Sequence, residues 1–148
     1  VLVHVVRCCV AVPLTVVRSL VGLFRAGFAP RKRMAIRALG MVTNSKVHLQ
    51  CNERGWERQG DNGEVFVDSC FQNCWDTTRA QPGRAGILLN FTGGKIGASF
   101  ASGAETRHAK EFLHELEPAI PGLTRAWNQK SALAFWLNKP WSRGSYSF

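Results

Sequence analysis

The sequence predicts an α+β fold with a mostly antiparallel sheet and a few flanking helices. Short apolar runs with strand character recur through the middle of the 148-residue chain, turn residues separate them, and an amphipathic helical pattern follows. Hydrophobic residues make up 45% of the sequence and charged residues 20%, a balance typical of chains that fold around a core. A chain of this length is expected to form one domain.

The first third is expected to contain a buried strand and a helix. Residues 1–12 are rich in β-branched side chains and lack helical periodicity, which predicts a buried strand ending at Pro13. A short turn or helix should follow. Pro30 suits the first turn of a second helix, which is expected to end at Gly40.

The remainder is expected to hold most of the sheet. Apolar and polar residues alternate over 46–51, which predicts a half-buried strand. Beyond it we expect polar turns over 52–63, a short strand marked by Val65 and Val67, a buried strand at 86–91, a helix over 103–116 and a last strand at 133–137.

The positive charge is concentrated near the N-terminus. Lys and Arg number 19 against 10 acidic residues, and residues 1–46 hold eight basic side chains and no carboxylate. Such a segment can bind an acidic partner or an anionic membrane surface. No nucleic-acid-binding motif accompanies the charge, so we expect no nucleic-acid partner.

Cysteine usage and the apolar N-terminus bear on the compartment. Five cysteines are an odd number in a chain too large to need disulfide staples, so a reducing compartment is expected. His4, Arg7 and Arg18 interrupt the apolar start before it reaches the roughly 18–20 residues of a membrane span. The order of charged and apolar residues does not fit a secretory signal. We therefore expect a cytoplasmic protein without a membrane span.

Two possible cofactor motifs are weak. Gly93, Gly94 and Gly97 are too irregular for a dinucleotide fingerprint, and they are not expected to open a clear helix. His48 and Cys51 are three positions apart on one predicted strand, an odd spacing, so their side chains should point to opposite faces. We therefore expect no metal site, even though other cysteines follow at Cys70 and Cys74.

Five aromatic and polar segments stand out in the sequence. They are LGMVTNSKVHLQ (39–50), FQNCWDTTRAQPG (71–83), GILLNFTGG (86–94), LEPAIPGLTRAWN (116–128) and FWLNKPWSRGSYSF (135–148). Together they resemble one family, the bacterial flavin-containing monoamine oxidases. Family members carry a strand ending Thr-Asn-Ser-Lys, a Trp-Asp segment, a Leu-Glu-Pro-x-x-Pro-Gly turn and a Pro-Trp-x-Arg-Gly-Ser-Tyr segment in this order.

The resemblance implies an FAD-dependent oxidation of a small-molecule amine with oxygen as acceptor. It divides the chain into residues 1–29, the edge strand and connection of a flavin-binding domain, and residues 30–148, a substrate domain that lies over the flavin ring. In such an enzyme the cofactor supplies the redox chemistry and the protein positions the amine.

The resemblance also implies roles for five side chains. Lys46 matches the family's active-site lysine, which holds a water beside the flavin. Tyr146 matches one of two tyrosines that flank the substrate nitrogen, and Trp136 is expected to contact the substrate as well. Trp141 is expected at the flavin, and Ser145 stands where some members carry a cysteine bonded to the flavin, which implies non-covalent FAD.

The sequence departs from the family pattern in several places. Val42 stands where relatives usually have glycine, Cys70 and Cys74 replace small or hydroxyl residues, and the second tyrosine is absent. The Gly-rich strand-turn-helix for the pyrophosphate and the flavin-closing segment are not found, so we expect the isolated chain to be inactive. The alternative is a non-catalytic remnant, or a binding module that uses the basic N-terminal third. The apolar flank at 1–17 is also expected to cause self-association.

Overall fold

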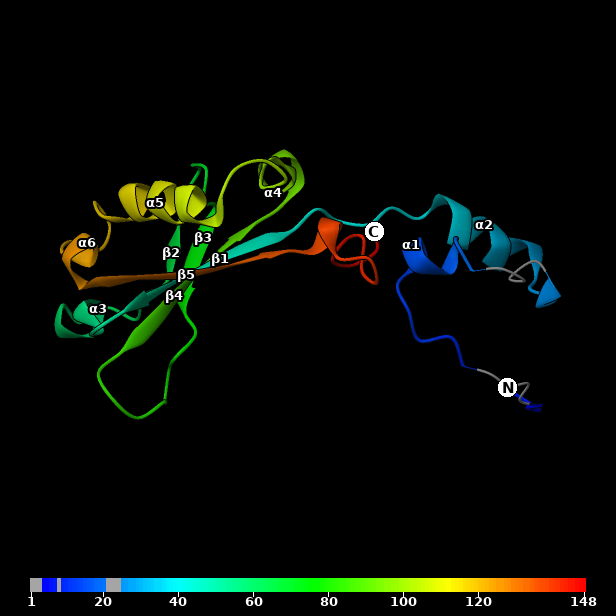
Figure 1. The fold of residues 1–148 in the computed structure, drawn as a ribbon, viewed down its shortest axis with the longest axis horizontal. Coiled ribbons are helices and arrows are strands. Elements are labelled where there is room, and N and C mark those ends of the chain that lie inside the picture. The colour runs from blue at the N-terminus through cyan, green and yellow to red at the C-terminus, as the bar shows by residue number, and fades with distance from the viewer. Residues whose placement is uncertain (1–3, 8, 21–24) are drawn as a thin grey trace.

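The computed structural model describes residues 4–7, 9–20 and 25–148, and it confirms an α+β fold with an antiparallel sheet (Figure 1). Its elements in chain order are α1 (Leu14–Val17), α2 (Pro30–Ala38), β1 (Ser45–Cys51), α3 (Gly55–Arg58), β2 (Val65–Phe66), β3 (Asn73–Asp76), β4 (Gly86–Thr92), α4 (Gly94–Ser99), α5 (Glu105–Leu116), α6 (Leu123–Ala126) and β5 (Trp127–Phe135). A 3-10 turn at Trp136–Asn138 follows β5.

The sheet has five strands in the order β2-β3-β4-β1-β5, and every pairing between neighbours is antiparallel. The strand β1 is therefore flanked on both sides, and Lys46 lies opposite Phe91 of β4 and Ala134 of β5. Since successive side chains of a strand point to opposite faces, this register decides which residues share a face.

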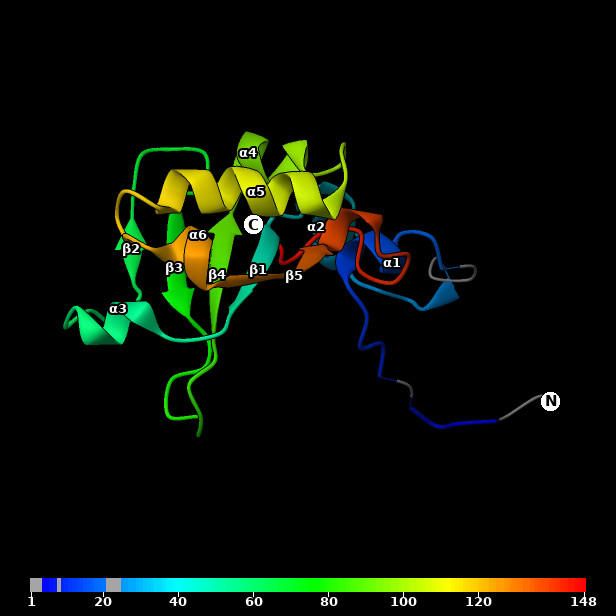
Figure 2. The ribbon, with the colours of Figure 1, turned by 60° about the vertical axis from the view of Figure 1, so that its left-hand side comes forward.

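One face of the sheet is covered by α5, as Figures 1 and 2 show. The predicted helical periodicity is confirmed, because α5 turns His108, Phe112 and Leu116 inward. These side chains pack on the buried positions of β1, of which Val47 and Leu49 are fully buried. Burying a large apolar side chain contributes roughly 1.5–3 kcal/mol each, so this face is the main source of stability.

The N-terminal segment differs from its prediction. The residues at 4–7 and 9–12 are exposed and form no strand, while residues 1–3 and 8 lie outside the described part of the chain. The buried strand expected over 1–12 is therefore wrong over the residues that the structure describes. A strand needs a neighbour for its backbone hydrogen bonds, and none of the described strands pairs with this segment.

The helical part near the N-terminus lies to one side of the sheet and meets the end of the chain (Figure 1). Helices α1 and α2 confirm the two expected helical segments. Thr15 of α1 donates a hydrogen bond to the Ser142 carbonyl at 2.8 Å, and Arg18 donates to the Ile36 carbonyl at 2.5 Å. The C-terminal segment is thus held between the sheet and the helices.

Other predicted boundaries need correction. The strands at β1 and β4 and the helix α5 are confirmed, but residues 52–63 contain the short helix α3 rather than turns alone. The strand β3 was not predicted, and β5 begins at Trp127, six residues before the predicted start. Gly93 and Gly94 do open a helix, α4, which the sequence did not predict.

Candidate functional site

The face of the sheet opposite α5 presents a set of half-buried side chains. Along β1 the burial alternates, with Ser45, Val47, Leu49 and Cys51 buried against α5 and the intervening residues half-buried on the other face. The register with β3, β4 and β5 extends this second surface, which we call the open face. It contains Lys46, His48, Gln50, Asn73, Trp75, Ile87, Leu89, Phe91, Ala132 and Ala134.

Lys46 lies on the open face near the start of β1, a strand that is paired on both sides. Its Nζ lies 5.5 Å from the centroid of the Phe91 ring, within the range of a cation–π interaction. It makes no ion pair with any side chain that the structure describes. The ammonium is therefore placed against an aromatic surface, with its hydrogen-bonding capacity still available.

Trp75 and Phe91 form an aromatic pair beside this lysine. Their ring centroids are 5.9 Å apart and their planes are tilted by 48°, an arrangement that stabilises a fixed aromatic wall. Asn73 lies opposite Phe91, and its side-chain oxygen is buried without a hydrogen-bond partner in the described chain. An unpaired buried acceptor indicates a surface that another group or water completes.

Sequence reasoning missed Asn73, Trp75 and Phe91 as site residues. The alternation of half-buried and buried residues over Asn73–Asp76 was the available signal, but four residues are too few to establish a strand by periodicity. The register between β1 and β4 places Phe91 opposite Lys46, and the register between β3 and β4 adds Asn73 and Trp75 to the same face.

Ser145 is held firmly at the start of β1. Its backbone nitrogen donates to the Val42 carbonyl at 2.9 Å, and its hydroxyl donates to Asn44 Oδ1 at 2.6 Å. Asn44 is buried and donates in turn to the Thr92 carbonyl at 3.1 Å. This network ties the C-terminal segment to the strand that carries Lys46.

The three predicted aromatic site residues are exposed. Tyr146, Trp136 and Trp141 have exposed fractions of 55%, 37% and 75%. The Tyr146 carbonyl accepts a hydrogen bond from the Val42 nitrogen at 2.8 Å, which places it four residues before Lys46 along the extended chain. No contact joins Tyr146 to Lys46 among the described residues, so the structure brings these two side chains to one end of the sheet without pairing them.

Gly97, one of the glycines after β4, serves packing. A Cβ atom on Gly97 would lie 1.9 Å from the Thr43 carbonyl oxygen, so α4 approaches this backbone too closely for any side chain. His48 lies on the open face and Cys51 on the face under α5, which confirms the alternation argument. The described residues hold no group of three potential metal ligands, and none of the described helices is long and apolar enough to cross a membrane.

The fold is shared with solved amine oxidase structures. A putrescine oxidase variant with redesigned cofactor binding superposes with a TM-score of 0.74 and 20% identity, covering 93% of this chain and 30% of that chain. Wild-type putrescine oxidase bound to putrescine gives 0.67 and 23%, with the same coverage. Cyclohexylamine oxidase from Brevibacterium oxydans IH-35A gives 0.64 and 19%, covering 79% of this chain and 26% of that one.

These structural similarities establish the fold, and a match to a family model establishes the family to which the chain belongs. The model described as flavin containing amine oxidoreductase matches residues 5–148. The chain therefore belongs to the flavin-containing amine oxidoreductase family, which confirms the resemblance found in the sequence. It spans less than a third of the length of the structures above. Among curated proteins, none matches it in sequence.

Proposed function

We propose that the open face is the roof of an FAD-dependent amine oxidase site, and that the FAD-binding parts of the family complete it. The observation that supports the proposal most is the position of Lys46, which lies near the start of β1 with its ammonium against the Phe91 ring. A surface that combines aromatic side chains, one ammonium and an unpaired Asn73 oxygen suits contact with a planar ring and its bound water.

The described residues fit one side of the flavin and lack a phosphate-binding loop. Gly97 is occupied by packing against the Thr43 backbone, and α4 has only six residues. Bound FAD would supply the redox chemistry of amine oxidation with oxygen as acceptor, and the residues of this chain would position the amine. Within this proposal Lys46 holds a water by hydrogen bonding, and Trp75 and Phe91 exclude bulk solvent from the site.

The Ser145 network supports non-covalent binding of FAD. A serine hydroxyl cannot replace the thiol through which some family members bond the flavin, and this hydroxyl already donates to Asn44. In the proposal, Tyr146 and Trp136 complete the amine side and Trp141 contacts the cofactor. Their exposure leaves them accessible to the parts of the enzyme that the family supplies elsewhere. The substrate is a small amine, and the protein acts in the cytoplasm.

The test uses a fusion in which this chain replaces the matching segment of putrescine oxidase. The proposal predicts that the fusion retains non-covalent FAD and shows amine-dependent hydrogen peroxide formation. Lys46→Met should reduce kcat strongly, while Lys130→Met, at an exposed position of β5, serves as the matched control. A fusion that retains no FAD, or in which both variants are equally active, would contradict the proposal.

A further inference from the structure

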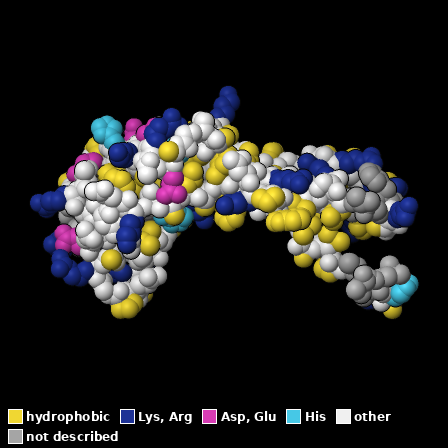
Figure 3. Space-filling view, viewed as in Figure 1, with side chains coloured by type: hydrophobic (Ala, Val, Ile, Leu, Met, Phe, Trp, Pro, Cys, Tyr) yellow, Lys and Arg dark blue, Asp and Glu magenta, His cyan; other side chains and the backbone are white. Residues whose placement is uncertain are grey.

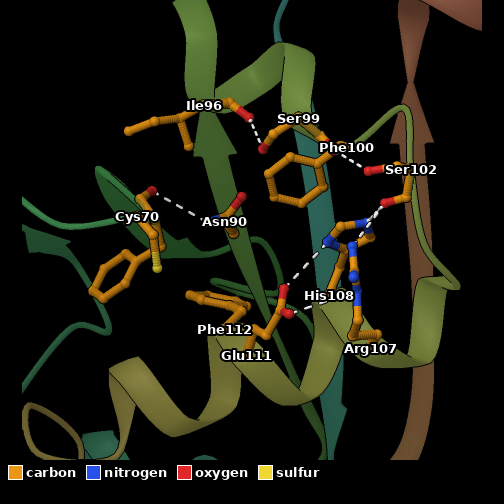
Figure 4. A pocket seen from close by; sticks show the side chains of 11 residues that line it. Cys70, Asn90, Ile96, Ser99, Phe100, Ser102, Arg107, His108, Glu111 and Phe112 are labelled. Atoms are coloured by element: carbon orange, nitrogen blue, oxygen red, sulfur yellow. Dashed lines mark hydrogen bonds and ion pairs between the residues drawn. The ribbon is translucent and has the colours of Figure 1, made fainter.

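A cavity on the opposite side of the sheet carries a second, independent inference. It has a volume of about 180 Å³ and lies between α4, α5 and β4 (Figure 4). Asn90 lies under it and Phe91, the next residue, lies on the open face, so the sheet separates the cavity from Lys46. An apolar cavity of about 150 Å³ is large enough to hold benzene.

Three phenylalanines form part of the cavity wall. Phe71 and Phe112 form a tilted pair with centroids 5.5 Å apart. Phe100 stacks on the imidazole of His108 at 4.5 Å. All three phenylalanines line the cavity. Rings held in this way give a small planar molecule apolar contact at several faces and edges.

The charged side chains around the cavity already contact neighbouring groups. His108 Nε2 lies 2.8 Å from the Ser102 carbonyl oxygen and Nδ1 lies 3.4 Å from Glu111 Oε2. Arg107 donates to the same carbonyl at 2.9 Å and its Nε lies 3.6 Å from Glu111 Oε1. Glu111 is thus balanced by neighbouring cationic or donor groups, so neither a free positive charge nor a free carboxylate awaits a ligand.

One acceptor is left over. Asn90 is 1% exposed, and its Nδ2 donates to the Phe71 carbonyl at 3.1 Å while its Oδ1 has no partner among the described residues. In Figure 4 this oxygen points toward Ile96 and Phe100. A buried acceptor without a partner costs roughly 1–3 kcal/mol, and a ligand that donates to it recovers part of this cost.

We propose that this cavity binds a small neutral aromatic molecule that carries one hydrogen-bond donor, of the phenol class. The ring would lie among the three phenylalanines and its hydroxyl would donate to Asn90 Oδ1. Because the charges of Arg107 and Glu111 offset each other, a neutral ligand fits better than an ammonium or a carboxylate.

Ligand-observed NMR on the complete 148-residue chain tests the proposal with phenol, toluene and benzylammonium as probes. Phenol should bind roughly 3- to 10-fold more tightly than toluene, the range expected from one neutral hydrogen bond. Benzylammonium should bind more weakly than phenol. Asn90→Leu should remove the preference for phenol, whereas Asn138→Leu, in the turn after β5 and away from the cavity, should leave it unchanged.

A second variant covers the case in which Asn90→Leu disturbs packing. Ser99 is exposed and lines the cavity, so Ser99→Trp should fill the opening and abolish phenol binding without touching the core. Equal binding of phenol and toluene, preferential binding of benzylammonium, or unchanged phenol binding in Ser99→Trp would overturn the proposal. These readouts need neither FAD nor turnover, so their failure is distinct from failure of the oxidase assignment.

Discussion

The Lys46 ammonium lies 5.5 Å from the centre of the Phe91 ring, its direct cross-strand neighbour on β4. The pairing follows from the register of two central strands rather than from proximity in sequence. This pairing fixes the direction in which the Lys46 side chain leaves the sheet. The side chain lies on the face that α5 does not cover. The relationship therefore links the fold of the chain to its proposed chemistry.

Loss of the Phe91 ring should impair the positioning of Lys46. In the putrescine oxidase fusion, Phe91→Leu is expected to lower kcat/KM about two- to five-fold, since an exposed cation–π contact is worth about 0.5–1 kcal/mol. Ile87→Leu, on the same strand and the same face, is the control. Steady-state kinetics check this, and equal effects of the two substitutions would show that the ring has no special role.

The buried hydrogen bond between Trp56 and Asp76 should stabilise the sheet at the end of β3. Trp56 is 1% exposed, and its Nε1 donates to Asp76 Oδ2 at 3.1 Å. Trp56→Phe is expected to lower the free energy of unfolding by about 1–3 kcal/mol, because it leaves a buried carboxylate oxygen short of a donor. Trp141→Phe, at a largely exposed site, should change it by less than about 0.5 kcal/mol. Urea denaturation measures both, and similar losses would refute the assignment.

The close approach of α4 to Thr43 should make Gly97 intolerant of a side chain. Gly97→Ala would place a Cβ atom 1.9 Å from the Thr43 carbonyl oxygen, and overpacking of this kind costs about 1–3 kcal/mol. Gly55→Ala is the matched control, because a Cβ atom there would have no close neighbour within 4 Å and the φ of Gly55 is not positive. Thermal unfolding midpoints should differ clearly between them, and equal midpoints would contradict the packing.

The two buried thiols should make stability depend on alkaline pH. Burial, aided by the charge of Asp76, raises the pKa of Cys51 to about 12, and burial also raises the pKa of Cys74. The folded state therefore keeps both protons more tightly than the unfolded state, whose thiol pKa is about 8.5. Their stabilising contribution is complete below that pKa and is lost as pH rises toward the folded value, by up to about 1.4 kcal/mol per pH unit for each thiol.

Denaturation at about pH 8, 9 and 10, which spans the rise through the unfolded thiol pKa, measures this loss. Cys51→Ala should reduce the pH dependence of the unfolding free energy by the contribution of one thiol. Cys9→Ala, at an exposed position, should leave this pH dependence unchanged. A slope that is the same in the parent chain and in both variants would show that Cys51 does not carry the raised pKa.

The N-terminal flank should drive self-association of the isolated chain. Val6 is 100% exposed and Val10 is 47% exposed, next to the apolar residues of α1. Figure 3 shows hydrophobic side chains gathered over this part of the surface. The double substitution Val6→Lys and Val10→Lys should lower the oligomeric fraction in sedimentation velocity, with Met34→Lys on α2 as the control. A monomeric parent chain at the same concentration would remove the basis for the prediction.

Local patterns predicted the parts of the fold that local chemistry determines. The alternation in β1 and the four-residue spacing of His108, Phe112 and Leu116 each identify one buried face, and both are confirmed. The β-branched residues before Pro13 have strand propensity but no partner strand among the described elements, and so those that the structure describes form none. Helix α4 depends on the contact between Gly97 and Thr43, which residue spacing cannot reveal.

The candidate site was likewise predictable only where it depends on local pattern or on the family resemblance. Lys46 follows from the family resemblance, and its place on the open face follows from the alternation. The aromatic wall depends on the register of β3 with β4, because Trp75 and Phe91 are far apart in sequence and adjacent only across strands. Non-local pairing is the information that a single sequence lacks.

Protection of the open face on assembly tests most directly whether this face forms the roof of the proposed FAD site. His48 lies on this face beside Lys46, while His114 is exposed on α5 on the other side of the sheet. Diethyl pyrocarbonate labelling, read by mass spectrometry, compares the isolated chain with the FAD-loaded putrescine oxidase fusion. His48 should lose most of its labelling in the fusion, while His114 should keep its own. Unchanged labelling of His48 would contradict a site roofed by this face.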